Sequence, residues 1–184
     1  HLQGKQRAMR ERLLELSTIV TAASLVLLVP VAAYNRAFVS LWVGSSMYAS
    51  DLVTLMGCVN IWLSALVSLW GWPITGTGSV RLIVPVTLSS LAVNVAVSIV
   101  ATSRWGIIGP LVGTLAALLG ISIWAVPRLL KRLFELSPVS LLTRALWPLT
   151  YGLPYAVCVW FASRQWPPTS WWQLLAEGTL SALA

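Results

Sequence analysis

The sequence predicts an all-α integral membrane protein, and three observations lead to this fold class. Of its 184 residues, 58% are hydrophobic and only 9% are charged, and the mean hydropathy is +0.82. A soluble domain carries about 25% charged residues, so the chain has too few polar side chains to cover a surface facing water. The apolar residues are also gathered into long runs, and the basic residues lie between those runs.

Six apolar segments are predicted to form transmembrane helices. A hydrocarbon core about 30 Å thick requires about 20 helical residues, and the first four segments suit this length. The fifth is shorter and contains Pro148 and Pro154, and the sixth is expected to be a partial span. The first five contain no Asp, Glu, Lys, Arg or His, and the alternation typical of a membrane barrel is missing from them. The segments are residues 17–34, 52–72, 82–101, 105–126, 145–162 and 171–184.

The distribution of lysine and arginine predicts the orientation of the chain. Nine of the 12 basic residues lie before the first segment, between the second and third, or between the fourth and fifth. Because cytoplasmic connections are enriched in Lys and Arg, the N-terminus and residues 127–144 are predicted to be cytoplasmic. We therefore expect a multi-pass protein of the cytoplasmic (inner) membrane. The nine residues are Lys5, Arg7, Arg10, Arg12, Arg81, Arg128, Lys131, Arg132 and Arg144; Arg36, Arg104 and Arg164 lie in the alternate connections.

The two ends of the sequence predict a portion of a longer protein. The chain begins without Met, and its last apolar segment is short for a span. Within the chain we distinguish three parts, which are residues 1–126, 127–144 and 145–184.

The part at residues 127–144 begins with PRLLKRLFEL, which alternates basic and apolar residues at helical spacing. Its leucines and Phe134 would share one face and its charged residues the other, as in a short interfacial helix on the cytoplasmic leaflet. A role as an anchor is favoured over a coupling or lipid-sensing role. Ser137 and Pro138 then suit the N-cap and the first position of a following helix.

The first connection, FVSLWVGSSMY at residues 38–48, is aromatic and uncharged. Phe38, Trp42 and Tyr48 are predicted to lie at the membrane interface, while residues 44–46 make the turn. Most of the 11 tryptophans likewise mark the ends of the apolar segments. Asp51, which follows Ser50 at the start of the second segment, suits the positive end of the helix dipole.

The chemistry-bearing residues of the sequence do not form a catalytic or metal-binding pattern. The one histidine is His1, the five acidic residues are scattered, and no P-loop, dinucleotide-binding motif or metal-ligand spacing occurs. The sequence therefore predicts no catalytic residue, no metal, no cofactor and no enzymatic activity. The net charge of +7 is not accompanied by a nucleic-acid-binding motif, so no nucleic-acid partner is expected.

Polar side chains within the apolar segments are the candidate substrate pathway. Ser90, Asn94 and Ser98 are spaced by four residues in the third segment, with Thr87 nearly aligned, and Asn60 lies in the second segment. Such a stripe either packs against another helix through hydrogen bonds or lines a water-filled cavity. Packing is the favoured alternative of the two.

A face of small residues runs along the fourth segment. Gly109, Gly113 and Ala117 repeat at intervals of four residues, and the first two form a GxxxG motif. This pattern predicts close approach of another helix. Pro110 adds a possible kink, which is common in carriers but also in membrane helices generally.

The order of these features resembles the polysaccharide (O-antigen type) flippases of the multidrug/oligosaccharidyl-lipid/polysaccharide exporter superfamily. The basic lead RAMRERLLELS (7–17) enters the first span, which ends in FVSLWVG (38–44) with Tyr48 following. Two helices later, WGIIG (105–109) introduces a run rich in small residues. The resemblance identifies residues 1–126 with C-terminal carrier-bundle helices and residues 145–184 with the additional, here truncated, helix pair of some members.

The resemblance implies the C-terminal part of a two-bundle carrier that flips a lipid-linked oligosaccharide or polysaccharide precursor by alternating access. Its partners would be the bilayer, that lipid-linked substrate and an N-terminal helical bundle of the same chain. The resemblance also implies a central cavity lined by basic residues, for which Arg36 and Arg81, at span ends, are the nearest candidates. Two alternatives remain open: a drug/cation antiporter of the same superfamily and a non-transporting membrane scaffold in polysaccharide synthesis.

Overall fold

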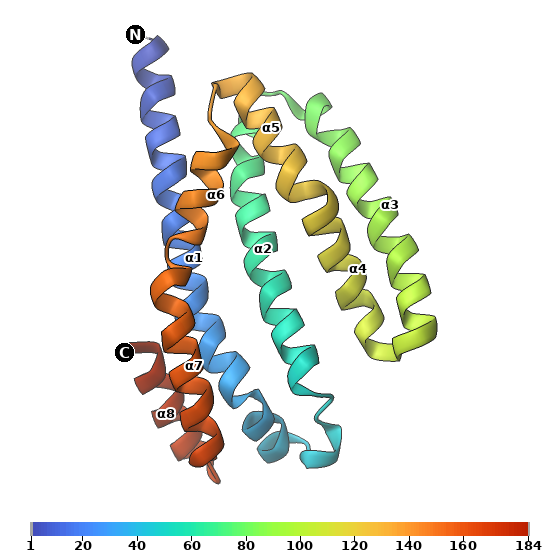
Figure 1. The fold of residues 1–184 in the computed structure, drawn as a ribbon, viewed down its shortest axis with the longest axis vertical. Helices are drawn as coiled ribbons and strands as arrows, with labels where there is room; N and C mark the ends of the chain where they lie inside the picture. The colour runs from blue at the N-terminus through green and yellow to red at the C-terminus, as the bar shows by residue number, and fades with distance from the viewer. Residues whose placement is uncertain (1, 184) are drawn as a thin grey trace.

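The computed structural model describes residues 2–183, and in this range the chain is α-helical, with short turns and no strand (Figure 1). Short turns of 3-10 helix occupy Ser45–Met47 and Gly106–Ile108, and a turn of π-helix occupies Leu118–Ser122. The α-helices are α1 (Leu2–Trp42), α2 (Asp51–Gly76), α3 (Val80–Trp105), α4 (Gly109–Ala117), α5 (Ile123–Phe134), α6 (Pro138–Leu146), α7 (Leu149–Gln165) and α8 (Trp171–Leu183).

Four helical stretches of the described chain are long and apolar enough to cross a membrane. The third, Val80–Phe134, is 55 residues long and folds back at residues 105–108, so α3 runs antiparallel to α4 and α5 (Figure 1). The predicted all-helical fold with several helices of membrane-spanning length is thus confirmed. The other three stretches are Gln6–Trp42, Asp51–Gly76 and Pro138–Gln165.

The first span is longer than the predicted segment because α1 continues through Trp42 despite Pro30. Arg36, which was predicted to lie at a span end, therefore lies inside α1. The turn falls where it was predicted: Gly44 has φ +99°, a conformation that glycine adopts without steric cost, and the 3-10 turn Ser45–Met47 follows it.

The fifth predicted segment is divided into two helices. The helix that leads into it begins at Pro138, as predicted, but the chain breaks between α6 and α7. Pro148 lies at the break, where it lacks the backbone N–H that a continuous helix would use. Ser137 and Pro138 occupy the N-cap and first position as predicted, although the Ser137 hydroxyl makes no capping hydrogen bond.

The amphipathic segment predicted to lie on the leaflet is helical but packs differently. Residues 127–134 form the second part of α5, which continues from α4 through the π-turn, and the apolar face of this part is buried inside the protein. Leu130 is fully buried in the cluster that joins α1, α2, α5 and α6. The physical reason for the difference is that the folded chain supplies a protein partner for this face, so the face does not rest on lipid.

The core consists of two separate clusters of apolar side chains. The larger one joins α1, α2, α5 and α6 near the N-terminal end of α1, and its centre is fully buried. In it, the Trp70 indole N–H donates a hydrogen bond of 2.9 Å to the Ser17 hydroxyl. The smaller cluster joins α1, α7 and α8 around Val29, Val159 and Leu174.

The connections of the bundle alternate between its two ends. The start of α1, the α2–α3 turn and the α5–α6 connection lie at one end, and the α1–α2, α3–α4 and α7–α8 turns lie at the other (Figure 1). The connections with nine basic residues are therefore gathered at one end, as the sequence pattern requires. Which end is cytoplasmic stays a prediction.

Replacing Trp70 tests the larger cluster. Trp70 is fully buried, whereas Trp72 in the same helix is 70% exposed. We expect Trp70→Ala to lower the free energy of unfolding by about 3–5 kcal/mol, the range for truncating a buried aromatic residue, and Trp72→Ala to change it little. Denaturant titration of the protein in detergent micelles measures both values, and equal losses would contradict the assigned core.

Candidate functional site

The predicted polar stripe of α3 and the small-residue face of α4 pack against each other. Gly109, Gly113 and Ala117 are all buried. A Cβ atom on Gly113 would lie 2.0 Å from the Ser98 hydroxyl oxygen and 2.6 Å from the Asn94 carbonyl oxygen. The glycines therefore allow the two backbones to approach closely, as the GxxxG motif predicts.

Hydrogen bonds between side chains reinforce this contact. The Asn94 amide donates to the Thr114 hydroxyl on α4 at 3.2 Å, and the Ser98 hydroxyl donates to the Asn94 amide oxygen at 3.1 Å. Ser90, one turn before Asn94 in α3, shares a hydrogen bond of 3.1 Å with the Ser122 hydroxyl in the π-turn. The partners on the fourth span, Thr114 and Ser122, were not singled out from the sequence, although they are polar residues in an apolar run.

The same stripe also borders a small cavity of about 280 Å³ whose lining is mostly apolar. We call it the polar cavity because the polar stripe forms part of its wall. Its polar lining comes from Thr87, Ser90 and Asn94 on α3 and from Ser122 in the π-turn, and α2 and α5 close it with apolar side chains. A π-turn often marks a functional position in a helix. Of the two alternatives for the stripe, packing applies to Ser98, while Ser90 and Asn94 both pack and line a cavity.

The remaining candidates lie away from this cavity. Asn60 is buried, and its amide donates to the Leu111 carbonyl on α4 at 3.0 Å. It therefore links α2 to the helical hairpin that α3 and α4 form. Its own amide oxygen is buried without a hydrogen-bond partner. Arg36 and Arg81 are exposed, in α1 and in the first turn of α3. The structure therefore does not bring these two arginines to the polar cavity.

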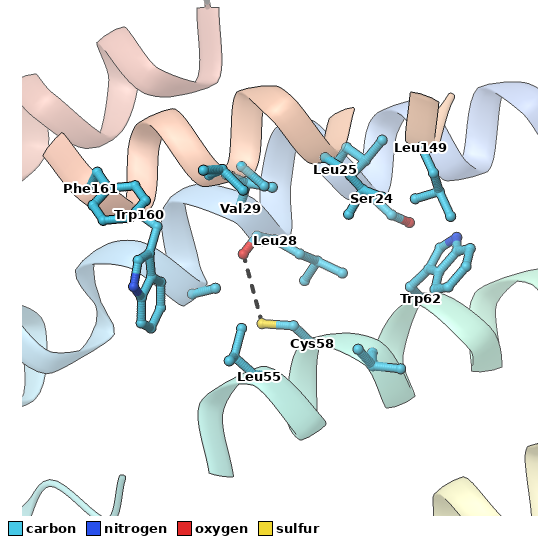
Figure 2. A pocket seen from close by; sticks show the side chains of 15 residues that line it. Ser24, Leu25, Leu28, Val29, Leu55, Cys58, Trp62, Leu149, Trp160 and Phe161 are labelled. Carbon is cyan, nitrogen blue, oxygen red and sulfur yellow. Dashed lines mark hydrogen bonds between the residues drawn. The ribbon is translucent and has the colours of Figure 1, made fainter. Parts of the chain in front are cut away.

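A second cavity, of about 400 Å³, lies between α1, α2 and α7 and is lined almost entirely by apolar side chains. Figure 2 shows Trp160 and Trp62 near its two ends, with side chains of α1 between them. The thiol of Cys58 donates to the Leu28 carbonyl at 3.7 Å (Figure 2). This cavity was not predicted, because no periodicity in one helix shows where three helices diverge.

Charged and polar side chains gather beyond one end of the apolar cavity. Asp51 forms an ion pair with Arg164 of α7 and accepts a hydrogen bond of 2.6 Å from the Tyr48 hydroxyl. The Arg164 guanidinium also lies 4.6 Å from the centre of the Trp160 ring, a cation–π contact. Burial raises the pKa of the Tyr48 phenol, and its hydrogen bond to Asp51 raises this pKa further. The phenol therefore stays protonated and keeps its donor role at neutral pH.

The partnership of Asp51 with Arg164 was not predicted from the sequence. Asp51 was assigned to the helix dipole, and the Ser50 hydroxyl does cap α2 by accepting from the Val53 N–H at 3.2 Å. One signal for this pairing was available in the sequence. Asp51 follows the predicted connection at residues 37–50, and Arg164 lies in the predicted connection at residues 163–170, which is on the same side of the membrane. That signal does not select one partner among several charges.

Comparisons with known proteins do not identify a relative from which the role of the site could be taken. No family model, curated protein or solved structure matches the chain. The functional argument therefore depends on the motifs in the sequence and on the geometry described above.

The close contact of α3 with α4 is tested by adding one methyl group. Gly113→Ala would place a Cβ against the α3 backbone, whereas a Cβ on Gly57 of α2 has no neighbour within 4 Å. We expect Gly113→Ala to lower the unfolding free energy by about 1–3 kcal/mol, the usual cost of overpacking. Gly57→Ala should leave stability unchanged or raise it slightly, because alanine suits a helix interior better. Thermal unfolding in micelles distinguishes the two, and a tolerated Gly113→Ala would overturn the contact.

Proposed function

We propose that the protein is the C-terminal part of a carrier that flips a lipid-linked oligosaccharide or polysaccharide precursor across the cytoplasmic membrane. The observation that carries this proposal is the order of three motifs, each at a helix end or turn. The basic lead 7–17 lies in the first turns of α1, FVSLWVG (38–44) ends that helix, and WGIIG (105–109) makes the α3–α4 turn. These are the places that the resemblance to polysaccharide flippases assigns to them.

The polar cavity beside α3 supports the proposal. Ser90, Asn94 and Ser122 place hydroxyl and amide groups within helices that are otherwise apolar. Polar groups at membrane depth are costly and usually mark a pathway for a polar substrate or ion. Neutral hydrogen-bonding groups of this kind suit a substrate rich in hydroxyl groups, such as a sugar.

The irregular backbone near this cavity also supports a carrier. The fourth span changes from α-helix to π-helix at Leu118–Ser122. Pro85 inside α3 and Pro127 inside α5 each remove a backbone hydrogen bond from their helix. Alternating access requires helices that can bend or rock against their neighbours. In this proposal α3 and α4 move as one unit, because their glycine contact leaves no room to slide.

The proposal also specifies the orientation of the chain in the membrane and the source of the basic residues that a carrier of this kind requires. The end with nine basic residues faces the cytoplasm, as the positive-inside rule expects. The α3 cavity contains no cationic side chain. In this proposal, the basic residues that the resemblance implies for the central cavity come from an N-terminal bundle of the same protein.

Complementation tests the proposal directly. The protein is expressed from its complete reading frame in bacterial strains that lack their own oligosaccharide-lipid flippase. We expect surface polysaccharide to be restored in at least one strain, measured by gel electrophoresis of the extracted polysaccharide. Correct membrane insertion without restoration for any tested lipid-linked sugar would contradict the proposal. Both alternatives, an antiporter and a scaffold, predict this negative result.

Two adjacent serines provide a matched control for the cavity. Ser90 lines it, whereas Ser89 is exposed on another face of α3. Ser90→Val should slow restoration of surface polysaccharide by about fivefold, as expected for one lost polar interaction of about 1 kcal/mol, and Ser89→Val should not. Equal membrane levels of both variants, measured by immunoblot, separate a transport defect from a folding defect.

A further inference from the structure

Three charged residues lie beyond one end of the apolar cavity between α1, α2 and α7. On each of the three helices, a charged residue lies four positions, or about one turn, beyond a residue that lines the cavity. Residues at this spacing share a helix face, so the three charges lie above the same opening. The pairs are Ala32 and Arg36 in α1, Leu55 and Asp51 in α2, and Trp160 and Arg164 in α7.

The charge at this end favours an anion. Asp51 is neutralised by its ion pair with Arg164. Arg36 is exposed, and none of the ion pairs among the described side chains of residues 6–183 includes it. The three residues together therefore carry one net positive charge above an apolar cavity. A ligand that suits this arrangement has a negative head and an apolar tail.

The length of the cavity corresponds to one leaflet of a bilayer. Its lining in α7 runs from Leu149 to Phe161, which at 1.5 Å per residue is about 18 Å. Half of a hydrocarbon core of about 30 Å is about 15 Å. A chain that fills the cavity from the charged end therefore ends near the middle of the bilayer, as the acyl chain of a phospholipid does.

The cavity is open on the side that faces outward between α2 and α7. Leu55 of α2 and Leu153, Val157 and Phe161 of α7 line it and are exposed at the same time. In Figure 2 the side chains of α2 and α7 border the space from opposite sides, with α1 behind them. A lipid chain can therefore enter sideways from the bilayer without any helix moving.

We infer that this cavity is a binding site for one acyl chain of an anionic glycerophospholipid whose phosphate lies against Arg36. The bound chain fills the space between three helices and stabilises their spacing, while the headgroup adds an anion to the Asp51–Arg164 pair. The inference requires that the helices span a bilayer and does not depend on the proposed transport activity.

Photo-crosslinking of the protein in nanodiscs tests the site. The discs contain phosphatidylglycerol with a diazirine near the end of one acyl chain, and crosslinked peptides are located by mass spectrometry. We expect labelling concentrated on the cavity-facing residues of α1, α2 and α7 compared with the exposed face of α3. Even labelling of all exposed spans in the unmodified protein would overturn the inference, and this result needs no variant.

Two alanines provide the matched test of the cavity itself. Ala156 of α7 lines the cavity, and Ala92 of α3 is exposed away from it. Ala156→Trp should fill the space and abolish cavity labelling, while Ala92→Trp should leave it unchanged. Persistent labelling of the same peptides in Ala156→Trp would show that the chain lies outside the cavity and would also overturn the inference.

The headgroup contact is tested with two exposed arginines at opposite ends of the bundle. Native mass spectrometry with added phosphatidylglycerol measures the affinity for each variant. Arg36→Gln should weaken binding by about fivefold, the contribution of one basic residue near an anionic lipid, and Arg81→Gln should leave the affinity for this site unchanged. Equal affinities for the unmodified protein and Arg36→Gln would overturn the assignment of the phosphate to Arg36.

Discussion

The packing of α1, from Met9 to Leu41, against helices from both halves of the chain is the constraint on which the rest of the structure depends. Lipid provides no hydrophobic force that drives helices together, so membrane helices associate through close packing and polar contacts. At one end Arg10 of α1 pairs with Glu135 at 2.9 Å and Ser17 accepts from Trp70. Near its other end α1 joins α7 and α8 in the smaller cluster. Helices from both halves of the chain are thereby packed against one continuous helix, α1.

The α3–α4 hairpin is organised by a different principle. Its two helices meet through glycines and hydroxyl groups, and it is joined to the remainder largely through α2 and α5. Asn60 forms one of these links by donating to the Leu111 carbonyl of α4. Because the hairpin has its own close contact and few polar links to its neighbours, it is the part of the bundle that we expect to move as a unit.

The polar cavity lies where these two groups of helices meet, whereas the apolar cavity lies within the group packed around α1. The polar cavity is at the junction of the hairpin with α2 and α5, beside the π-turn that displaces Ser122 from a regular helix. The apolar cavity separates α2 from α7, with α1 as its inner wall. Their linings follow from their positions, since the hairpin carries the polar stripe and the outer helices present side chains suited to lipid.

The sequence by itself determined the helical class, the presence of several helices long enough to cross a membrane, the gathering of basic residues toward one end, the turn at Gly44 and the close-packing face at Gly109 and Gly113. These features depend on composition and on residues a few positions apart, where hydropathy, backbone conformation and helical period act locally. Only the tertiary structure decided that Asp51 pairs with Arg164, that the apolar face of α5 is buried in protein, and where the two cavities lie. Those outcomes depend on which helices become neighbours, and a single sequence pattern does not select the partner of an apolar face or of a charge that is distant along the chain.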